Sequence, residues 1–179
     1  TSKKTQSDNS NIKTAGLDIP KDEADLLYTA LVDSAIDNPT NTDYEKLRFA
    51  HAASSNYKPY ADNEGLTKLR DLIKDEEYEV ASEVLQTYYR TLFHDALFHY
   101  YAFVIWKNLE DEDMAKIHSY YYSKLIESII QDKEGTSKKD AFIVINISEE
   151  YRVMEYLEMK MVEQNLIEDG LHSFDKIKA

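Results

Sequence analysis

Histidines beside acids and serines are the residues of this sequence whose types and spacing could do chemistry, as metal ligands or in proton transfer. His94, Asp95 and His99 lie close together, and His51 lies one turn before Ser54. On a helix, His94 and His99 would differ by about 140° in direction and could not hold one metal ion. A serine and a histidine on one helix also lack the strained turn and the oxyanion hole of a hydrolase. We therefore predict that His94 and His99 are core or boundary residues bonded to their neighbours, and that His51 packs on the second helix.

The alternative is a small hydrolase or metal-dependent enzyme that uses His94, Asp95 or His51. Such an enzyme needs at least two of these groups close to one point in a pocket. The consecutive acids at 110–113 could attract calcium, but they lack the glycine and the closing glutamate of a calcium-binding loop. We interpret them as the start of a helix, where the helix dipole favours acids, and calcium binding there stays open. The four glycines form no phosphate-binding loop, so no cofactor is expected.

Tyrosine is used unusually often, at 14 of 179 positions. Tyr120, Tyr121 and Tyr122 are consecutive, so on a helix at least one of them must leave the core face. Tyrosine combines an apolar ring with a polar tip and is enriched in protein interfaces. We predict that the outward tyrosine contacts a partner. A half-buried position at the edge of the core is the simpler alternative.

Stretches near both ends of the chain resemble an uncharacterised family of bacterial proteins. The pattern Tyr-x-x-Leu-Arg followed by Tyr-x-Pro-Tyr occurs at 44–48 and 57–60. The pattern Asp-Ala-Phe-x-Val-x-x-Ile-Ser-x-Glu-Tyr occurs at 140–151, and Gln-x-Leu-Ile follows at 164–167. The family is a domain of unknown function, often found on exported proteins, and it brings no assigned active site. Some similar proteins are substrates of bacterial secretion systems.

The resemblance draws attention to Arg48, Tyr57, Tyr60 and Glu150. These side chains lie in the two stretches that carry the resemblance, far apart in the sequence. A loop with two tyrosines and a proline could dock on the C-terminal stretch. The residues therefore form either a partner-binding surface or a structural clasp between the two stretches.

Helices must position most of these residues. Apolar side chains recur every three or four residues in the stretches 21–37, 42–56, 64–75, 77–90, 92–109 and 114–131. The stretch 92–109 is apolar on almost every face, so we expect it, with Trp106, at the centre of the core. Thr42 and Glu45 are spaced as a capping box at the start of the second helix. Small residues at the expected crossings predict tetratricopeptide-like pairs, with a generic orthogonal bundle as the alternative.

The pattern changes beyond residue 140. Residues 141–147 are β-branched and continuous, which is typical of a strand covered on both faces. Residues 149–157 have helical spacing, and two alternating stretches flank Asp169-Gly170, a hairpin signal. The predicted fold is α+β and mostly α, with about six helices in tetratricopeptide-like antiparallel pairs followed by a small, mainly antiparallel C-terminal β-sheet.

Length and charge narrow the possible functions. A chain of 179 residues fits one domain, which we place at 20–179 with the sheet at about 140–179. Residues 1–19 are polar and are expected to be a disordered leader. The net charge of −13 repels nucleic acid, and no apolar run approaches the ~20 residues that insertion into a membrane needs. The absence of cysteine excludes disulfides and thiolate catalysis.

We therefore predict a non-enzymatic, exported bacterial protein that binds a protein or peptide through a helical surface, with a secretion-system substrate as one form of this role. The polar leader favours a secreted or periplasmic protein whose signal peptide has been removed, and a cytoplasmic protein is the alternative. The oligomeric state stays open. The predicted partner-binding residues are Tyr120, Tyr121, Tyr122, Tyr57, Tyr60 and Arg48.

We expect EDTA to leave the melting temperature unchanged, because no set of potential ligands has the spacing of a zinc or calcium site. Thermal unfolding followed by circular dichroism, with and without EDTA, tests this. A clear drop in melting temperature that calcium or zinc restores would show that the non-metal interpretation is wrong.

Overall fold

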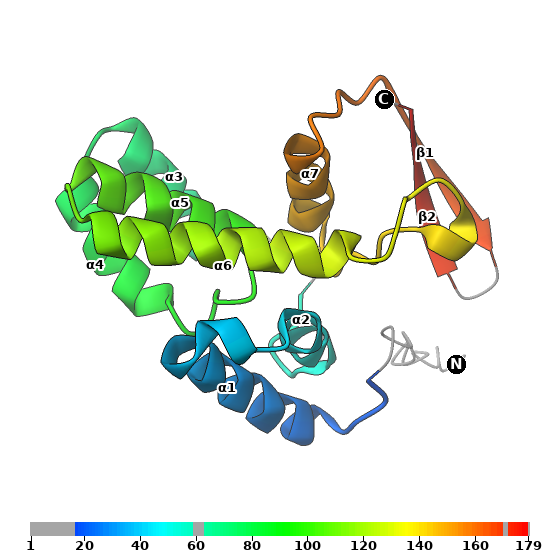
Figure 1. Cartoon of the computed structure of the whole chain (residues 1–179), viewed down its shortest axis with the longest axis horizontal. Helices are drawn as coiled ribbons and strands as arrows, with labels where there is room; N and C mark the ends of the chain where they lie inside the picture. Colours follow the sequence, from blue (N-terminus) through cyan, green and yellow to red (C-terminus); the bar gives the residue numbers. More distant parts are fainter. Residues whose placement is uncertain (1–16, 59–62, 170–171, 179) are drawn as a thin grey trace, which may run out of the picture.

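A computed structural model describes residues 17–58, 63–169 and 172–178. The described residues form seven α-helices and one two-stranded antiparallel sheet, so the predicted α+β, mostly α class is confirmed (Figure 1). Most of the predicted leader, residues 1–16, lies outside the described residues, and residues 17–20 have no regular structure.

The helices are α1 (Lys21–Asp37), α2 (Tyr44–Ala53), α3 (Glu64–Lys74), α4 (Tyr78–Tyr88), α5 (Ala96–Asn108), α6 (Glu112–Ile130) and α7 (Ile147–Tyr156), with single 3₁₀ turns at Pro39–Asn41 and Lys138–Asp140. Consecutive helices pack together as α1 with α2, α3 with α4 and α5 with α6. Helix α6 runs across the middle of the molecule, and α7 packs against both α5 and α6 (Figure 1).

Side-chain caps set where several helices begin. Asp43, not Thr42, caps α2 by accepting a hydrogen bond from the Lys46 N–H at 2.9 Å, so the predicted capping box is wrong. Asp95 likewise accepts from the Leu97 N–H at 2.8 Å and starts α5 at Ala96. The expected helix at 92–109 therefore begins later than predicted, because its first residues form a turn that carries Asp95 to the cap position.

Two clusters of buried apolar side chains form the core. The first joins α1, α2 and α6 and includes Leu47, Phe93 and Ile126. The second joins α3, α4 and α5 and includes Leu69 and Phe98. Trp106 is only partly buried and packs against the second cluster from outside it, so the expectation that Trp106 lies at the centre of the core is wrong.

The expected strand at 141–147 is wrong. Among the described residues, this stretch pairs with no strand and runs as irregular chain into α7. Its backbone groups bind side chains instead: the Ile143 carbonyl accepts from Arg48, and the Ile145 carbonyl accepts from the Tyr57 hydroxyl at 2.5 Å. Ile145 is buried, whereas Ile143 is exposed. The β-branched run thus packs on helices rather than between two strands.

The C-terminal hairpin is confirmed. Strands β1 (Glu163–Asp169) and β2 (His172–Lys178) pair antiparallel, with Ile167 opposite Phe174. In Figure 1 the hairpin lies beyond the end of α6. Its contacts with the helical part include the Lys138 ammonium over the Phe174 ring, at 5.6 Å from the ring centroid.

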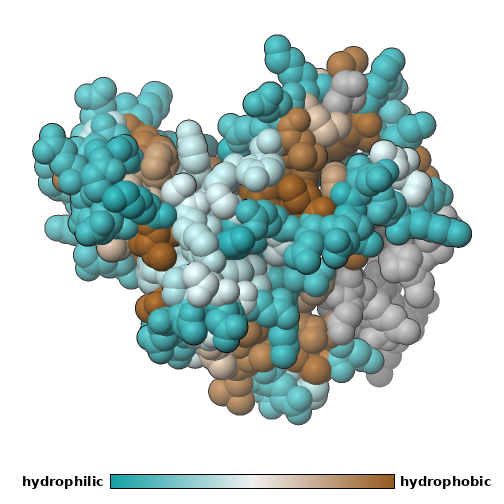
Figure 2. All heavy atoms as spheres, in the orientation of Figure 1, coloured by the Kyte–Doolittle hydropathy of each residue, from teal (hydrophilic) through white to brown (hydrophobic). Residues whose placement is uncertain are grey.

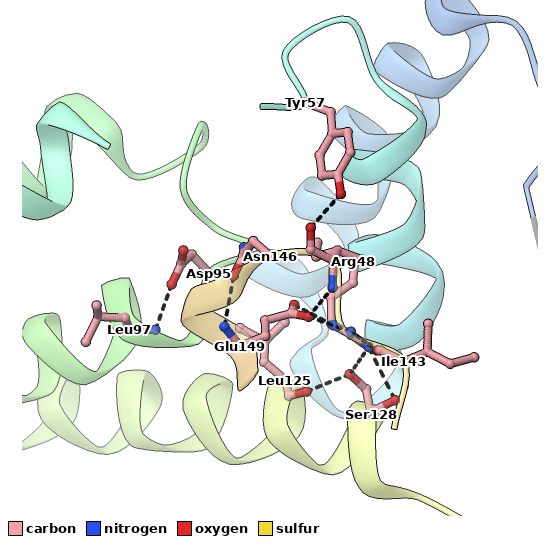
Figure 3. A network of polar contacts seen from close by, with 10 residues as sticks. Arg48, Tyr57, Asp95, Leu97, Leu125, Ser128, Ile143, Asn146 and Glu149 are labelled. Carbon is pink, nitrogen blue, oxygen red and sulfur yellow. Dashed lines mark hydrogen bonds and ion pairs between the residues drawn. The ribbon is translucent and has the colours of Figure 1, made fainter. Parts of the chain in front are cut away.

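A buried ion pair between Arg48 and Glu149 joins the two stretches of the sequence that carry the family resemblance (Figure 3). Arg48 is 0% exposed and Glu149 is 2% exposed. Arg48 Nε and Nη2 each donate to one carboxylate oxygen of Glu149 at 2.7 Å, and Nη2 also donates to the Ile143 carbonyl at 2.7 Å. Arg48 Nη1 lies 3.4 Å from the Ser128 carbonyl, and Glu149 accepts from the Ile145 N–H at 2.8 Å. The pair therefore ties together α2, α6, α7 and the stretch before α7.

These contacts form a structural clasp, the second of the two roles that the resemblance suggested. The acid in the clasp is Glu149 and not Glu150, which is half-buried and accepts a hydrogen bond from Gln164 of β1 at 3.1 Å. Arg48 was also predicted as a partner-binding residue, and this is corrected because its guanidinium is fully buried. Tyr57 contributes through its bond to the Ile145 carbonyl, whereas Tyr60 lies outside the described residues.

Replacing Arg48 by Met should lower the free energy of unfolding by ~3–5 kcal/mol, because Glu149 would be left buried without its partner. The double variant Arg48→Met/Glu149→Leu should recover much of this loss, since both charges are then removed. Urea unfolding measures the free energy of unfolding of both variants. As a control, Arg90→Met removes the exposed ion pair with Asp33 and should change stability by about 0.5 kcal/mol or less. Equal effects of Arg48→Met and Arg90→Met would contradict the importance of the clasp.

Candidate functional site

The three consecutive tyrosines of α6 point in different directions. Tyr121 is 2% exposed and its hydroxyl donates to the Ala35 carbonyl at 3.2 Å, so its prediction as a partner contact is corrected. Tyr120 is partly buried, with the Lys124 ammonium 5.7 Å from its ring centroid. Tyr122, also partly buried, faces α5 and α7. Helical geometry thus places only the middle tyrosine in the core.

Tyr122 belongs to a surface formed by tyrosines of three helices, which we name the tyrosine surface: Tyr100 of α5, Tyr122 of α6 and Tyr156 of α7. Tyr100 and Tyr156 are 40% and 42% exposed. The ring centroids of Tyr100 and Tyr122 are 6.1 Å apart. Burial raises the pKa of the Tyr122 hydroxyl, and the nearby carboxylate of Glu155 raises it further, while Arg152 lowers it. In Figure 2 the face in view over the middle of α6 shows a pale band of intermediate hydropathy beside hydrophilic surface.

A pocket of about 560 Å³ lies where α3, α5 and α7 begin. Its lining comes from the segments 51–58, 63–70, 91–101 and 146–148. The capping residues of the three helices, Asn63, Asp95 and Asn146, all belong to this lining. Figure 3 shows two of these caps, Asp95 and Asn146, each bonded to the first turn of its own helix.

The structure brings together the histidines that the enzyme alternative named. The rings of His51 and His94 stack in the pocket wall, with centroids 3.4 Å apart and an interplanar angle of 13°. Tyr28 Oη lies 3.2 Å from His94 Nδ1, and the Tyr57 ring packs edge-on against His51. Burial lowers the pKa of His51 to about 4 and that of His94 well below its usual value. Both rings are therefore neutral at pH 7 and stack without charge repulsion.

The two serines that follow His51 differ in their bonding. Ser54, one turn after His51, is buried, and its hydroxyl has no hydrogen-bond partner among the described residues. The Ser55 hydroxyl donates to Asp25 Oδ2 at 2.7 Å, so its proton is not directed at His51. The Asp95 carboxylate caps α5, and burial raises its pKa to about 6. No group of three or more His, Asp or Glu within the described ranges could hold a metal ion.

His99 and His118 form a second histidine pair, in the core. Their Nδ1 atoms are 2.9 Å apart, and His99 Nε2 lies 2.9 Å from the Phe93 carbonyl. Because His99 Nε2 must donate to that carbonyl, His99 Nδ1 accepts and His118 Nδ1 donates. Burial lowers the pKa of both rings. The expectation that His94 and His99 pack in the core is confirmed, since they are 4% and 0% exposed.

The acids at 110–113 begin α6, as the helix-start interpretation predicted. Asp111 accepts a hydrogen bond from the Met114 N–H at 3.0 Å. Glu112 forms an exposed ion pair with Lys107, at 2.7 Å. Asp111 and Glu112 are thus engaged within the chain itself.

Comparison with known proteins gives one match. The model of a family described as Domain of unknown function (DUF4919) matches residues 18–177. The chain belongs to this family. The DUF4919 match covers both the clasp and the pocket, and it confirms the resemblance to an uncharacterised family. No curated protein and no solved structure matches the chain. No described helix of this DUF4919 chain is both long and apolar enough to cross a membrane.

Stability of this DUF4919 protein should fall as the pH falls from about 6.5 towards 4. The pKa values of His51, His94, His99 and His118 are lowered in the folded state, so only the unfolded chain binds protons in this range. Each histidine should contribute a slope of about 1.4 kcal/mol per pH unit. Asp95, whose pKa is raised to about 6, has the opposite effect. Between pH 6 and the ordinary pKa of an aspartate, its protonation stabilises the folded state as the pH falls.

Urea unfolding at a series of pH values measures this slope. The variant His118→Phe should reduce the slope by the contribution of one histidine, whatever its effect on stability at pH 7.5. A free energy of unfolding that does not change between pH 7 and pH 5 would contradict the neutral state of the buried histidines.

Proposed function

We propose that this protein is a non-enzymatic binding protein that docks a protein or peptide partner on the tyrosine surface. The observation that carries the proposal is the meeting of Tyr100, Tyr122 and Tyr156 on one face, each from a different helix and each incompletely buried. Tyrosine rings provide a large amphipathic contact area at small entropic cost, and such residues dominate the energetics of protein interfaces.

The surroundings of the tyrosine surface also suit an interface. Arg152 pairs with Glu155 on α7, and Lys124 pairs with Glu127 on α6 at 2.6 Å. Charges of both signs thus border the aromatic rings. Protein interfaces commonly have an aromatic centre and a polar rim of this kind. Because all three tyrosines are carried by helices packed against one another, the surface is pre-organised and should lose little freedom on binding.

The enzyme alternative has less support. The Ser54 hydroxyl is buried and makes no hydrogen bond to His51 among the described residues, and the Ser55 hydroxyl is bonded to Asp25. His94 and Asp95 are almost fully buried, and the Asp95 carboxylate serves as a helix cap. A catalytic base would need to reach a substrate proton within hydrogen-bonding distance.

The compartment belongs to the same proposal. We favour an exported bacterial protein, secreted or periplasmic, and a secretion-system substrate is one form of this role. The resemblance to exported proteins supports this. The absence of cysteine is compatible with an oxidising compartment. Fractionation of the native host with an antibody against the protein tests it, and recovery only from the cytoplasm would contradict export.

Tyr122→Ala and Tyr100→Ala should each weaken partner binding by about tenfold or more, because they remove central aromatic contacts. The measurement is affinity capture from extracts of the native host and of cells exposed to it, followed by titration of the captured protein. Leu26→Ala is the matched control, since Leu26 is 74% exposed on α1, a helix that carries none of the three tyrosines.

The variants must first be shown to keep the wild-type circular dichroism spectrum. Binding that survives both tyrosine substitutions would contradict the proposal. Loss of an activity in a folded His51→Ala variant, with partner binding intact, would favour the enzyme alternative instead.

A further inference from the structure

The pocket at the starts of α3, α5 and α7 gathers cationic groups in a chain whose net charge is −13. Lys58 and Arg70 both line it and are exposed. Arg70 also pairs with Asp71, its neighbour in α3, at 3.0 Å. Two acids belong to the lining: Glu64 is exposed in the first turn of α3, and Asp95 is buried and caps α5. Among the described lining residues, Glu64 is thus the acid that a bound molecule would meet.

The helix starts add partial positive charge to the same pocket. The first N–H groups of a helix have no partner within the helix, and the aligned peptide dipoles make this end positive. The cap side chains already bind some of these N–H groups: Asn63 accepts from the Leu66 N–H at 3.3 Å, and Asn146 accepts from the Glu149 N–H at 2.8 Å. Other N–H groups of the three first turns are left for an acceptor from outside the helix.

The neutral rings of His51 and His94 line the same pocket and offer further donors or acceptors. Ser148 also lines the pocket, but its hydroxyl oxygen is closed off from solvent and therefore from a molecule in the pocket. An oxygen-rich group in the pocket would meet the histidine rings rather than the Ser148 hydroxyl.

The dimensions of the pocket suit more than an inorganic ion. Its volume of about 560 Å³ falls in the usual range of small-molecule sites, roughly 300–1,000 Å³. Tyr57, Tyr101, Leu66 and Leu97 supply aromatic and apolar walls. A ligand that fits this lining has an anionic group and an apolar or aromatic body.

We propose that this pocket binds a small organic anion through a carboxylate or phosphate group. Lys58, Arg70 and the helix N–H groups hold the anionic group, and the walls that include Tyr57 and Tyr101 hold its body. This site is separate from the tyrosine surface and does not depend on the binding of a protein partner there.

Three probes of similar shape test the proposal: benzoate, phenyl phosphate and the uncharged benzamide. Amide chemical shifts of the full chain are followed in NMR titrations at low salt. Benzoate or phenyl phosphate should bind and shift amides at 64–67 and 146–148, and the stronger of the two identifies the preferred anionic group. Added sodium chloride should weaken binding, because it screens the charges. Benzamide binding as tightly as both anions would overturn the proposal, and so would the absence of binding by both anions at millimolar concentration.

Charge variants make the test specific. Arg70→Met should weaken binding of the preferred anion by about tenfold, as expected for a charge-assisted hydrogen bond. Glu64→Gln should strengthen binding, because it removes the exposed acid of the lining. Lys107→Met is the control, since Lys107 lies in the last turn of α5, away from the pocket. The affinity of this variant for the anion should match that of the wild type. Weaker binding in Glu64→Gln, or equal losses in Arg70→Met and Lys107→Met, would overturn the proposal.

Discussion

Arg48 is charged at any physiological pH and is fully buried, so the fold must supply it with a carboxylate and with acceptors for its other N–H groups. Glu149 and the Ile143 carbonyl meet this requirement at 2.7 Å, and the Ser128 carbonyl lies within 3.4 Å. Satisfying one side chain therefore fixes where α7 lies against α2 and α6. Helix α7 in turn carries Tyr156 of the tyrosine surface and Ser148 of the pocket, so both proposed sites depend on the clasp.

The two sites use different parts of α5 and α7. The pocket lies at the N-terminal ends of α5 and α7, where Asp95 and Asn146 cap them. The tyrosine surface uses Tyr100, one turn further along α5, and Tyr156, the last residue of α7. Polar groups thus gather where backbone N–H groups need acceptors, while the amphipathic tyrosines gather on the helix faces. This division follows from helix geometry, because only the ends of a helix have unpaired backbone groups.

Much of the helical fold could be predicted from the sequence, because local signals mark its boundaries. The limits of α1 were predicted correctly, since Pro20 precedes it and Asn38-Pro39 follows it. The error at 141–147 has a physical cause: a β-branched run shows that a segment packs well, but it does not show whether strands or side chains will bind its backbone. The candidate site was harder to predict. His51 and His94 stack across a long sequence separation, and no local pattern reveals that Arg48 points inward to meet Glu149 rather than Glu150.

The partners in the clasp are 101 residues apart in the sequence, and this separation has a consequence for the order of events during synthesis. A ribosome releases the chain from its N-terminus, so α1 to α6 emerge before residue 149. Until then, the guanidinium of Arg48 has no carboxylate and must stay in water, which keeps α2 from settling against α6. The interior of this protein can therefore close only after its seventh helix has left the ribosome.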